Sequence, residues 1–214
     1  MAKLKGVIFD VDGTLTSTNK LIFASFNHVS QKYLNRSFSD DELIKFFGPT
    51  EDVILKQWCG DNYESARKDY YGYYSENHSM ADLYPGMLNV LNYLKEKNVL
   101  LSIYTGKGEE AANITLKKLG IFSYFDMVIT GDDVQEHKPS PEGITLFLDK
   151  FNLKKENAII IGDAPTDIIA ANSAGIKVAS VIWDSYAKDK VLKLKSDFVF
   201  ETVSELFEFL KENT

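Results

Sequence analysis

The sequence predicts an α/β fold in which a parallel sheet, layered with helices, is interrupted by an inserted helical unit. Short runs rich in β-branched residues alternate with segments of helical periodicity, the pattern of parallel strands joined by helical crossovers. This alternation stops between about residues 17 and 83, where only helical periodicity remains. These two observations give the fold class, and the individual elements follow from local signals.

The predicted strands are short apolar runs bounded by polar or glycine-containing segments. Runs of this kind are typical of strands that are buried on both faces of a parallel sheet. They lie at residues 5–9, 99–104, 127–130, 158–161, 178–182 and 198–200.

Helical stripes and capping residues separate most of these strands. Apolar residues recur at helical spacing over 87–94, 112–119, 144–151 and 203–210. Ser140 followed by Pro141 predicts an N-cap and a first-turn proline. Thr166 is expected to cap the helix that follows the fourth strand, and Thr202 with Glu205 forms a capping box for the last helix.

Residues 17–82 are predicted to form a four-helix insertion. Apolar positions 22, 26, 29 and 33 form one stripe, Ser39 with Glu42 offers a capping box, and further helices are expected around Trp58 and over 61–78. The tyrosines at 70, 71, 73 and 74 are too many for one helix face, so some should be exposed or line a cleft. We therefore expect a core of residues 1–16 and 83–214 with a cap of residues 17–82.

Composition narrows the classes of function. A net charge of −7 opposes broad contact with nucleic acid or with an anionic membrane. The single cysteine, Cys59, cannot close an intrachain disulfide, and nowhere do eighteen apolar residues occur together. We expect a cytoplasmic protein without nucleic-acid or membrane partners, monomeric by default with a dimer as the alternative.

Acidic residues follow two of the predicted strands. Asp10 and Asp12 come after the first strand and Asp163 after the fourth, and the carboxyl ends of parallel strands meet at one edge of a sheet. Crowded carboxylates are tolerable mainly when a divalent cation neutralises them, and oxygen ligands suit Mg²⁺. Asp10, Asp163 and the backbone carbonyl of Asp12 are the predicted metal ligands. One carboxylate of the first pair can then act as a nucleophile and the other as a general acid and base.

Other polar residues at the same edge suit the binding of a phosphoryl group. Thr105 offers a hydroxyl and Gly106 an unobstructed backbone N–H, which together can hold a phosphate oxygen. Lys138 is a compact cation that can reach both the phosphate and Asp10. Asp167, one helical turn after Asp163, is expected to orient Lys138 or a metal-bound water.

These segments resemble the four signatures of the haloacid dehalogenase superfamily of phosphohydrolases. The signatures occur in order as DVDGT at 10–14, Thr105-Gly106, Lys138-Pro139, and GDAPTD at 162–167. The resemblance implies a Rossmann-like core, a helical cap inserted after the first signature, and obligatory magnesium. It also implies that Asp10 is phosphorylated transiently while Asp12 acts as general acid and base.

Within the superfamily, the sequence is similar to the branch that contains phosphoglycolate phosphatases, pyrophosphatases and β-phosphoglucomutases. The resemblance implies a phosphatase for a small phosphorylated metabolite or pyrophosphate, with Thr50 and Glu51 in a cap loop that faces the substrate. A phosphosugar mutase is the alternative enzyme, but the histidine that mutases carry at the position of Ile22 is missing here. A binding module without turnover is the non-enzymatic alternative, against which the intact pair of Asp10 and Asp12 argues.

Overall fold

The computed structural model describes residues 2–214 and contains a six-stranded parallel sheet with the strand order β5-β4-β1-β6-β7-β8. Each of these strands begins and ends within one residue of a predicted run, so the predicted α/β class is confirmed. The strands are β1 (Gly6–Phe9), β4 (Leu100–Tyr104), β5 (Met127–Ile129), β6 (Ala158–Gly162), β7 (Lys177–Val181) and β8 (Phe198–Phe200).

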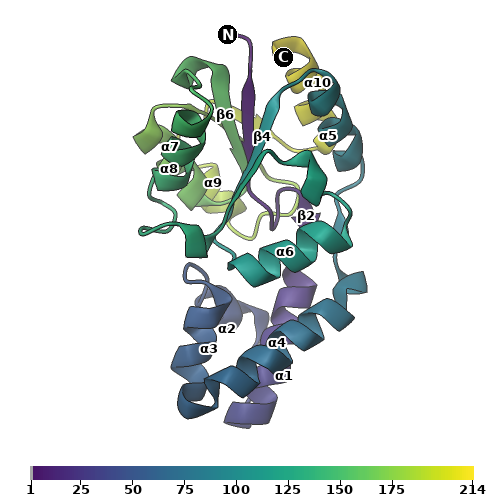
Figure 1. Cartoon of the computed structure of the whole chain (residues 1–214), viewed down its shortest axis with the longest axis vertical. Coiled ribbons are helices and arrows are strands. Elements are labelled where there is room, and N and C mark those ends of the chain that lie inside the picture. Colours follow the sequence, from purple (N-terminus) through teal and green to yellow (C-terminus); the bar gives the residue numbers. More distant parts are fainter. Residues whose placement is uncertain (1) are drawn as a thin grey trace.

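Helices cover both faces of the sheet because successive strand residues point to opposite faces. Val7 and Phe9 pack with α5 (Met87–Glu96) and α10 (Val203–Asn213) in one apolar cluster. Ile8, between them, belongs to the opposite cluster with α7 (Glu142–Lys150), α8 (Pro165–Ala174) and α9 (Lys188–Val191). The sheet is thus the middle layer of three (Figure 1).

A separate apolar core lies among the helices of the insertion, called the helical unit below. The unit comprises α1 (Asn19–Leu34), α2 (Asp40–Ile44), α3 (Glu51–Cys59) and α4 (Tyr63–Glu76), with short 3₁₀ turns at Gly60–Asn62 and His78–Met80. Helix α6 (Glu109–Lys118) lies between this unit and the sheet (Figure 1). Ala111 of α6 packs in the core of the helical unit, whereas Leu116 packs against the sheet.

The chain enters and leaves the helical unit through a two-stranded antiparallel ribbon that the periodicity did not predict. Strand β2 (Thr16–Ser17) pairs with β3 (Asp82–Leu83), so the two connections run side by side. Strands of two residues have no detectable period, and this pairing exists only because the fold brings the two connections together.

Helix caps agree with the prediction in two places and differ in two. Both capping boxes are present, at α2 and α10. Helix α7 begins one residue later than expected, so Pro141 is its N-cap, while the Ser140 hydroxyl accepts the Glu142 N–H at 3.2 Å. The cap predicted at Thr166 is wrong, because Ala164 is the N-cap of α8 and the Asp167 carboxylate accepts its N–H at 3.0 Å.

Three of the four clustered tyrosines are buried. Tyr70, Tyr71 and Tyr74 pack in the core of the helical unit, while the half-buried Tyr73 stacks on His28. Phenol rings on several faces of α4 therefore serve mainly to pack this helix against its neighbours.

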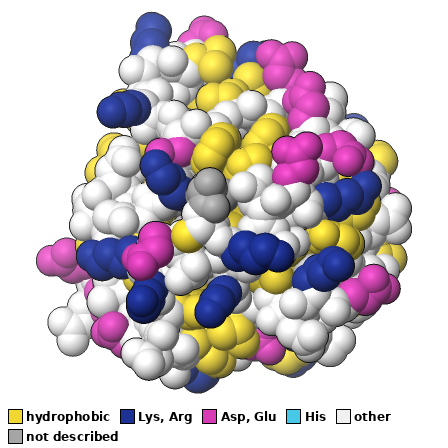
Figure 2. All heavy atoms as spheres, turned by 90° about the horizontal axis from the view of Figure 1, so that it is seen from above, with side chains coloured by type: hydrophobic (Ala, Val, Ile, Leu, Met, Phe, Trp, Pro, Cys, Tyr) yellow, Lys and Arg dark blue, Asp and Glu magenta, His cyan; other side chains and the backbone are white. Residues whose placement is uncertain are grey.

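The end of the molecule that carries the termini has basic and acidic side chains interspersed among hydrophobic ones (Figure 2). This face presents no continuous surface of a single charge sign. Within residues 2–214, every helix is too short or too polar to cross a membrane.

Candidate active site

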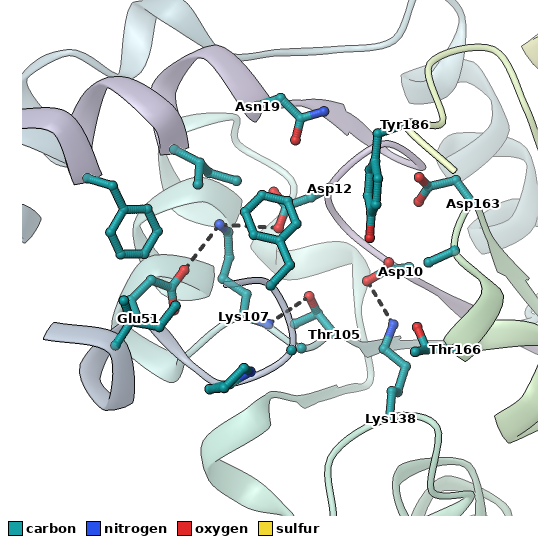
Figure 3. A pocket seen from close by; sticks show the side chains of 18 residues that line it. Asp10, Asp12, Asn19, Glu51, Thr105, Lys107, Lys138, Asp163, Thr166 and Tyr186 are labelled. Atoms are coloured by element: carbon teal, nitrogen blue, oxygen red, sulfur yellow. Dashed lines mark hydrogen bonds and ion pairs between the residues drawn. The ribbon is translucent and has the colours of Figure 1, made fainter. Parts of the chain in front are cut away.

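A cavity lies at the carboxyl ends of the strands, where the helical unit faces the sheet. Its volume is about 180 Å³. Asp10, Thr105 and Asp163 line it from the sheet side, and Phe47 and Glu51 line it from the helical unit. Figure 3 shows side chains from segments distant in sequence converging on this space. Such a position is the usual ligand site of open α/β sheets.

Asp10, directly after β1, is fixed by the sheet and by its own neighbours. Its backbone N–H donates to the carbonyl of Ile161 at 2.9 Å, which extends the pairing of β1 with β6. The Val11 N–H donates to the Asp10 carboxylate at 2.8 Å, and Lys138 Nζ lies 3.1 Å from the same oxygen. Burial raises the pKa of Asp10 to about 6, although Lys138 opposes this rise.

Lys138 bridges two carboxylates. Its Nζ donates to Asp167 Oδ1 at 2.7 Å and lies 3.1 Å from Asp10 Oδ1. Burial alone would lower the pKa of Lys138, but Asp10 and Asp167 together raise it above its usual value. Since the other oxygen of Asp167 accepts the Ala164 N–H, Asp167 holds the start of α8 and the position of Lys138 at once.

Asp163, after β6, faces Asp10 across a tight turn. The Thr14 hydroxyl donates to Asp163 Oδ1 at 3.0 Å. Gly13 has a φ of 77°, and a Cβ there would lie 2.5 Å from the Asp163 carboxylate. A glycine is therefore required for the turn and Asp163 to coexist. The pKa of Asp163 is raised well above its usual value, mainly because the carboxylate is buried and to a smaller extent because Asp10 and Asp167 repel its charge.

These groups fit a hard divalent cation. One carboxylate oxygen from each of Asp10, Asp163 and Asp167 lies within 4.8 Å of the others. Both oxygens of Asp167 are already engaged, by Lys138 and by the Ala164 N–H. Among residues 2–214, no hydrogen-bond donor reaches the carbonyl oxygen of Asp12. Asp10, Asp163 and this carbonyl thus offer oxygen ligands of the kind that Mg²⁺ prefers, and a cation would offset the repulsion between the two carboxylates.

The side chain of Asp12 points to a different set of partners from Asp10 (Figure 3). One of its oxygens accepts a hydrogen bond from the Thr18 hydroxyl, at the start of α1. The other lies 3.2 Å from Lys107 Nζ. The two acids of the first signature are therefore close in sequence but have different charged partners, Lys138 for Asp10 and Lys107 for Asp12.

Thr105 and Gly106 follow β4 at the same edge of the sheet. The Thr105 N–H donates to the Ile129 carbonyl at 3.0 Å, and its hydroxyl accepts the Lys107 N–H at 3.3 Å. Within the described chain, the Gly106 N–H has no hydrogen-bond acceptor, and Gly106 lines the cavity. A donor free in this way can bind an oxygen of a substrate.

The two residues predicted in the cap loop differ in position. Glu51 lines the cavity, accepts the Gly108 N–H at 2.7 Å and lies 3.5 Å from Lys107 Nζ. Thr50 is not among the lining residues; its side chain is buried against Gly131, which follows β5. The expected substrate-facing position of Thr50 is therefore not found, because the loop turns its side chain toward the sheet layer.

Several lining residues were not predicted as site residues. Lys107 directly follows the second signature, so its place in the sequence could have indicated that it lies at the site. Tyr186, from the loop after β7, contacts Phe47 of the helical unit edge to face, with ring centroids 5.7 Å apart. Asn19 is the first residue of α1. Neither Tyr186 nor Asn19 belongs to a pattern that a sequence alone would single out.

The raised pKa of Asp10 predicts a stability effect in the metal-free protein. Between its usual pKa of 3.8 and the folded value of about 6, the folded state binds more protons, so the free energy of unfolding falls as pH rises. Asp10→Asn removes this cost and should stabilise the metal-free protein at pH 8 by on the order of 2–3 kcal/mol. Below pH 4 the two proteins should be equally stable. Urea unfolding with a chelator at both pH values tests this, and an equal difference at the two pH values would contradict it.

Comparisons with known proteins identify the family of the chain. The family model of haloacid dehalogenase-like hydrolases matches residues 7–181. Pyrophosphatase PpaX of Bacillus pumilus is 32% identical over 201 residues, which cover 94% of this chain and 93% of that protein.

Two solved structures share the fold over nearly the whole chain. A crystal structure of a predicted phosphoglycolate phosphatase from Haemophilus somnus has a TM-score of 0.84 at 24% identity, covering 98% of this chain and 99% of that one. CbbY from Rhodobacter sphaeroides, solved in complex with phosphate, has a TM-score of 0.82 at 18% identity, covering 95% and 96%. With the family match over most of its length and the four signatures gathered at one cavity, the chain belongs to the haloacid dehalogenase-like hydrolase family.

Proposed function

We propose that the protein is a magnesium-dependent phosphatase that hydrolyses a small phosphorylated metabolite or pyrophosphate through a phosphorylated Asp10. The observation that carries this proposal is the arrangement of Asp10 at the base of the cavity, with Lys138 on one side and Asp163 on the other. A carboxylate held in this way can attack a phosphorus atom, while the charges around it balance those of the phosphoryl group.

The steps of the proposed reaction are assigned to residues that have different partners in the structure. Asp10 would attack the phosphorus, with the Thr105 hydroxyl, the Gly106 N–H and Lys138 binding the phosphoryl oxygens. Asp12 would first protonate the leaving oxygen and then take a proton from the water that releases phosphate. Asp167 would keep Lys138 in place through its hydrogen bond of 2.7 Å.

Asp10, Asp163 and the Asp12 carbonyl would hold Mg²⁺. When bound, the cation supplies positive charge that offsets the charge of the phosphoryl group. Asp167 is better described as a residue that positions Lys138, because its two oxygens already accept hydrogen bonds from Lys138 and from the Ala164 N–H.

The cavity favours a compact substrate. Its volume of about 180 Å³ is below the range of about 300–1,000 Å³ that is typical of small-molecule sites. Ile22, Phe26 and Ile54 give it an apolar wall on the side of the helical unit. The apolar Ile22 cannot exchange a proton with a sugar hydroxyl, which favours a phosphatase over a phosphosugar mutase. We further propose that residues 17–82 act as a cap that closes over the substrate and excludes water.

A phosphate-release screen tests the proposal. We expect Mg²⁺-dependent release of phosphate from phosphoglycolate or pyrophosphate, and loss of that release when a chelator removes the cation. Restoration by added Mg²⁺ is the control against irreversible damage. Release that continues at full rate in the chelator would contradict the metal requirement. Absence of release from any small phosphoester tested, with Mg²⁺ present, would contradict the phosphatase itself.

A further inference from the structure

We propose that Lys107 is a positioning residue that holds Asp12 in its working orientation, and that Glu51 of the helical unit completes this arrangement when the unit lies against the sheet. This inference rests on the proposed role of Asp12 as general acid and base. It assigns a task to a buried lysine outside the predicted catalytic set.

Lys107 is enclosed between the sheet layer and the helical unit. Its side chain is 1% exposed. Nζ lies 3.2 Å from Asp12 Oδ2, 3.5 Å from Glu51 Oε1 and 5.1 Å from the centre of the Tyr74 ring. A buried ammonium group is costly unless it is paired, so these partners account for its presence in the interior. Two of the three, Glu51 and Tyr74, belong to the helical unit.

Glu51 connects the helical unit to the same segment of the sheet layer by a second contact. Its other oxygen accepts the Gly108 N–H at 2.7 Å, at the N-terminus of α6, where a negative charge is favoured. A Cβ on Gly108 would lie 3.0 Å from this oxygen. The carboxylate therefore reaches Lys107 and Gly108 together only while α3 stays seated on this segment.

Asp12 is held at both of its oxygens. The Thr18 hydroxyl donates to one, and Lys107 faces the other. If the helical unit moved away, Lys107 would lose its contacts with Glu51 and Tyr74, and its side chain could turn from Asp12 toward the solvent. The geometry thus links the position of the helical unit to the orientation of the acid. Asp12 is held at both oxygens only when the unit lies against the sheet and encloses the substrate.

Lys107 has a second conceivable role, binding an acidic group on the substrate directly. The structure favours the positioning role, because Nζ already faces two carboxylates and the side chain is almost fully enclosed. The two roles predict different substrate dependence, which allows one experiment to separate them.

The test measures kcat and KM of Lys107→Met with Mg²⁺ on three substrates. Phosphoglycolate has a second acidic group and a leaving oxygen that needs a proton; ethyl phosphate has only such a leaving oxygen; p-nitrophenyl phosphate has neither. Positioning of the acid predicts that kcat falls about 10²-fold on the first two. On p-nitrophenyl phosphate the rate of the initial nitrophenolate burst should fall at least about tenfold less, because nitrophenolate leaves without protonation, whereas the second step still needs Asp12 as a base. Lys177→Met, at an exposed surface lysine, is the matched control and should change none of the three.

Glu51→Gln provides a second variant in case Lys107→Met does not fold. It should show the same substrate dependence, and the double variant should lose little more than the stronger single one, since both changes act on one arrangement. A loss confined to phosphoglycolate would show direct substrate binding and overturn the proposal. A burst rate on p-nitrophenyl phosphate that fell as far as kcat on ethyl phosphate, or additive losses in the double variant, would also overturn it. In each of these cases the wild-type protein still hydrolyses the esters, so the proposed function stands apart from this result.

Discussion

Asp10→Asn is expected to lower kcat for phosphate release by about 10⁴-fold or more, the range expected when an enzyme loses its nucleophile. The amide has nearly the same size as the carboxylate and can still accept the Val11 N–H. It lacks the charge that would attack phosphorus, and it leaves Lys138 with only Asp167 as an ionic partner. Steady-state phosphate release with Mg²⁺ and substrate well above KM measures this loss.

A phosphorylation experiment shows whether that loss has the proposed cause. Rapidly quenched wild-type protein should carry phosphate on the peptide that contains Asp10, and Asp10→Asn should carry none. Asp149→Asn, at an exposed aspartate on α7, is the matched control and should keep the wild-type rate. Phosphate attached elsewhere in the chain, or near-normal turnover by Asp10→Asn, would refute the role of Asp10. Folding is checked by the same unfolding measurement that should find this variant stabilised at pH 8.

Asp12→Asn is expected to lower kcat on phosphoglycolate by about 10²–10⁴-fold, the usual contribution of general acid–base catalysis. The amide can still accept a hydrogen bond from Thr18 or Lys107, so the local structure should survive. It cannot deliver a proton to the leaving oxygen or take one from the attacking water. The side chain of Asp12 is not part of the cluster of carboxylates that contains Asp10 and Asp163, so the variant should still bind the metal.

An activated ester separates the two tasks of Asp12. With p-nitrophenyl phosphate the first step needs no acid, whereas the second still needs a base. Asp12→Asn should therefore release a burst of about one nitrophenolate per protein and then turn over slowly, with phosphate accumulating on Asp10. Stopped-flow absorbance measures the burst. A variant that turned over this ester slowly from the first cycle, without a burst, would assign Asp12 a purely structural role.

Local patterns predicted most of the fold because they report what each segment buries. The six parallel strands are short, mostly apolar runs, and the capping boxes at Ser39 and Thr202 depend on residues three positions apart. Signals failed where a contact is not local. The ribbon of β2 and β3 has no period of its own, because its strands come from the two ends of the inserted segment. The start of α8 is a different case: its cap is local, from Asp167 to the Ala164 N–H, but the prediction placed it at Thr166.

The same distinction applies to the site. The gathering of Asp10, Thr105, Lys138 and Asp163 at one edge of the sheet was predictable from the order of the strands, because parallel strands bring their carboxyl ends together. In contrast, the contact of Asp12 with Lys107, and of Lys107 with Glu51, depends on the packing of the folded chain. The contact with Glu51 exists only because the helical unit lies against the sheet layer, where Ala111 of α6 packs in the core of the unit, and no repeating pattern in the chain reports that placement.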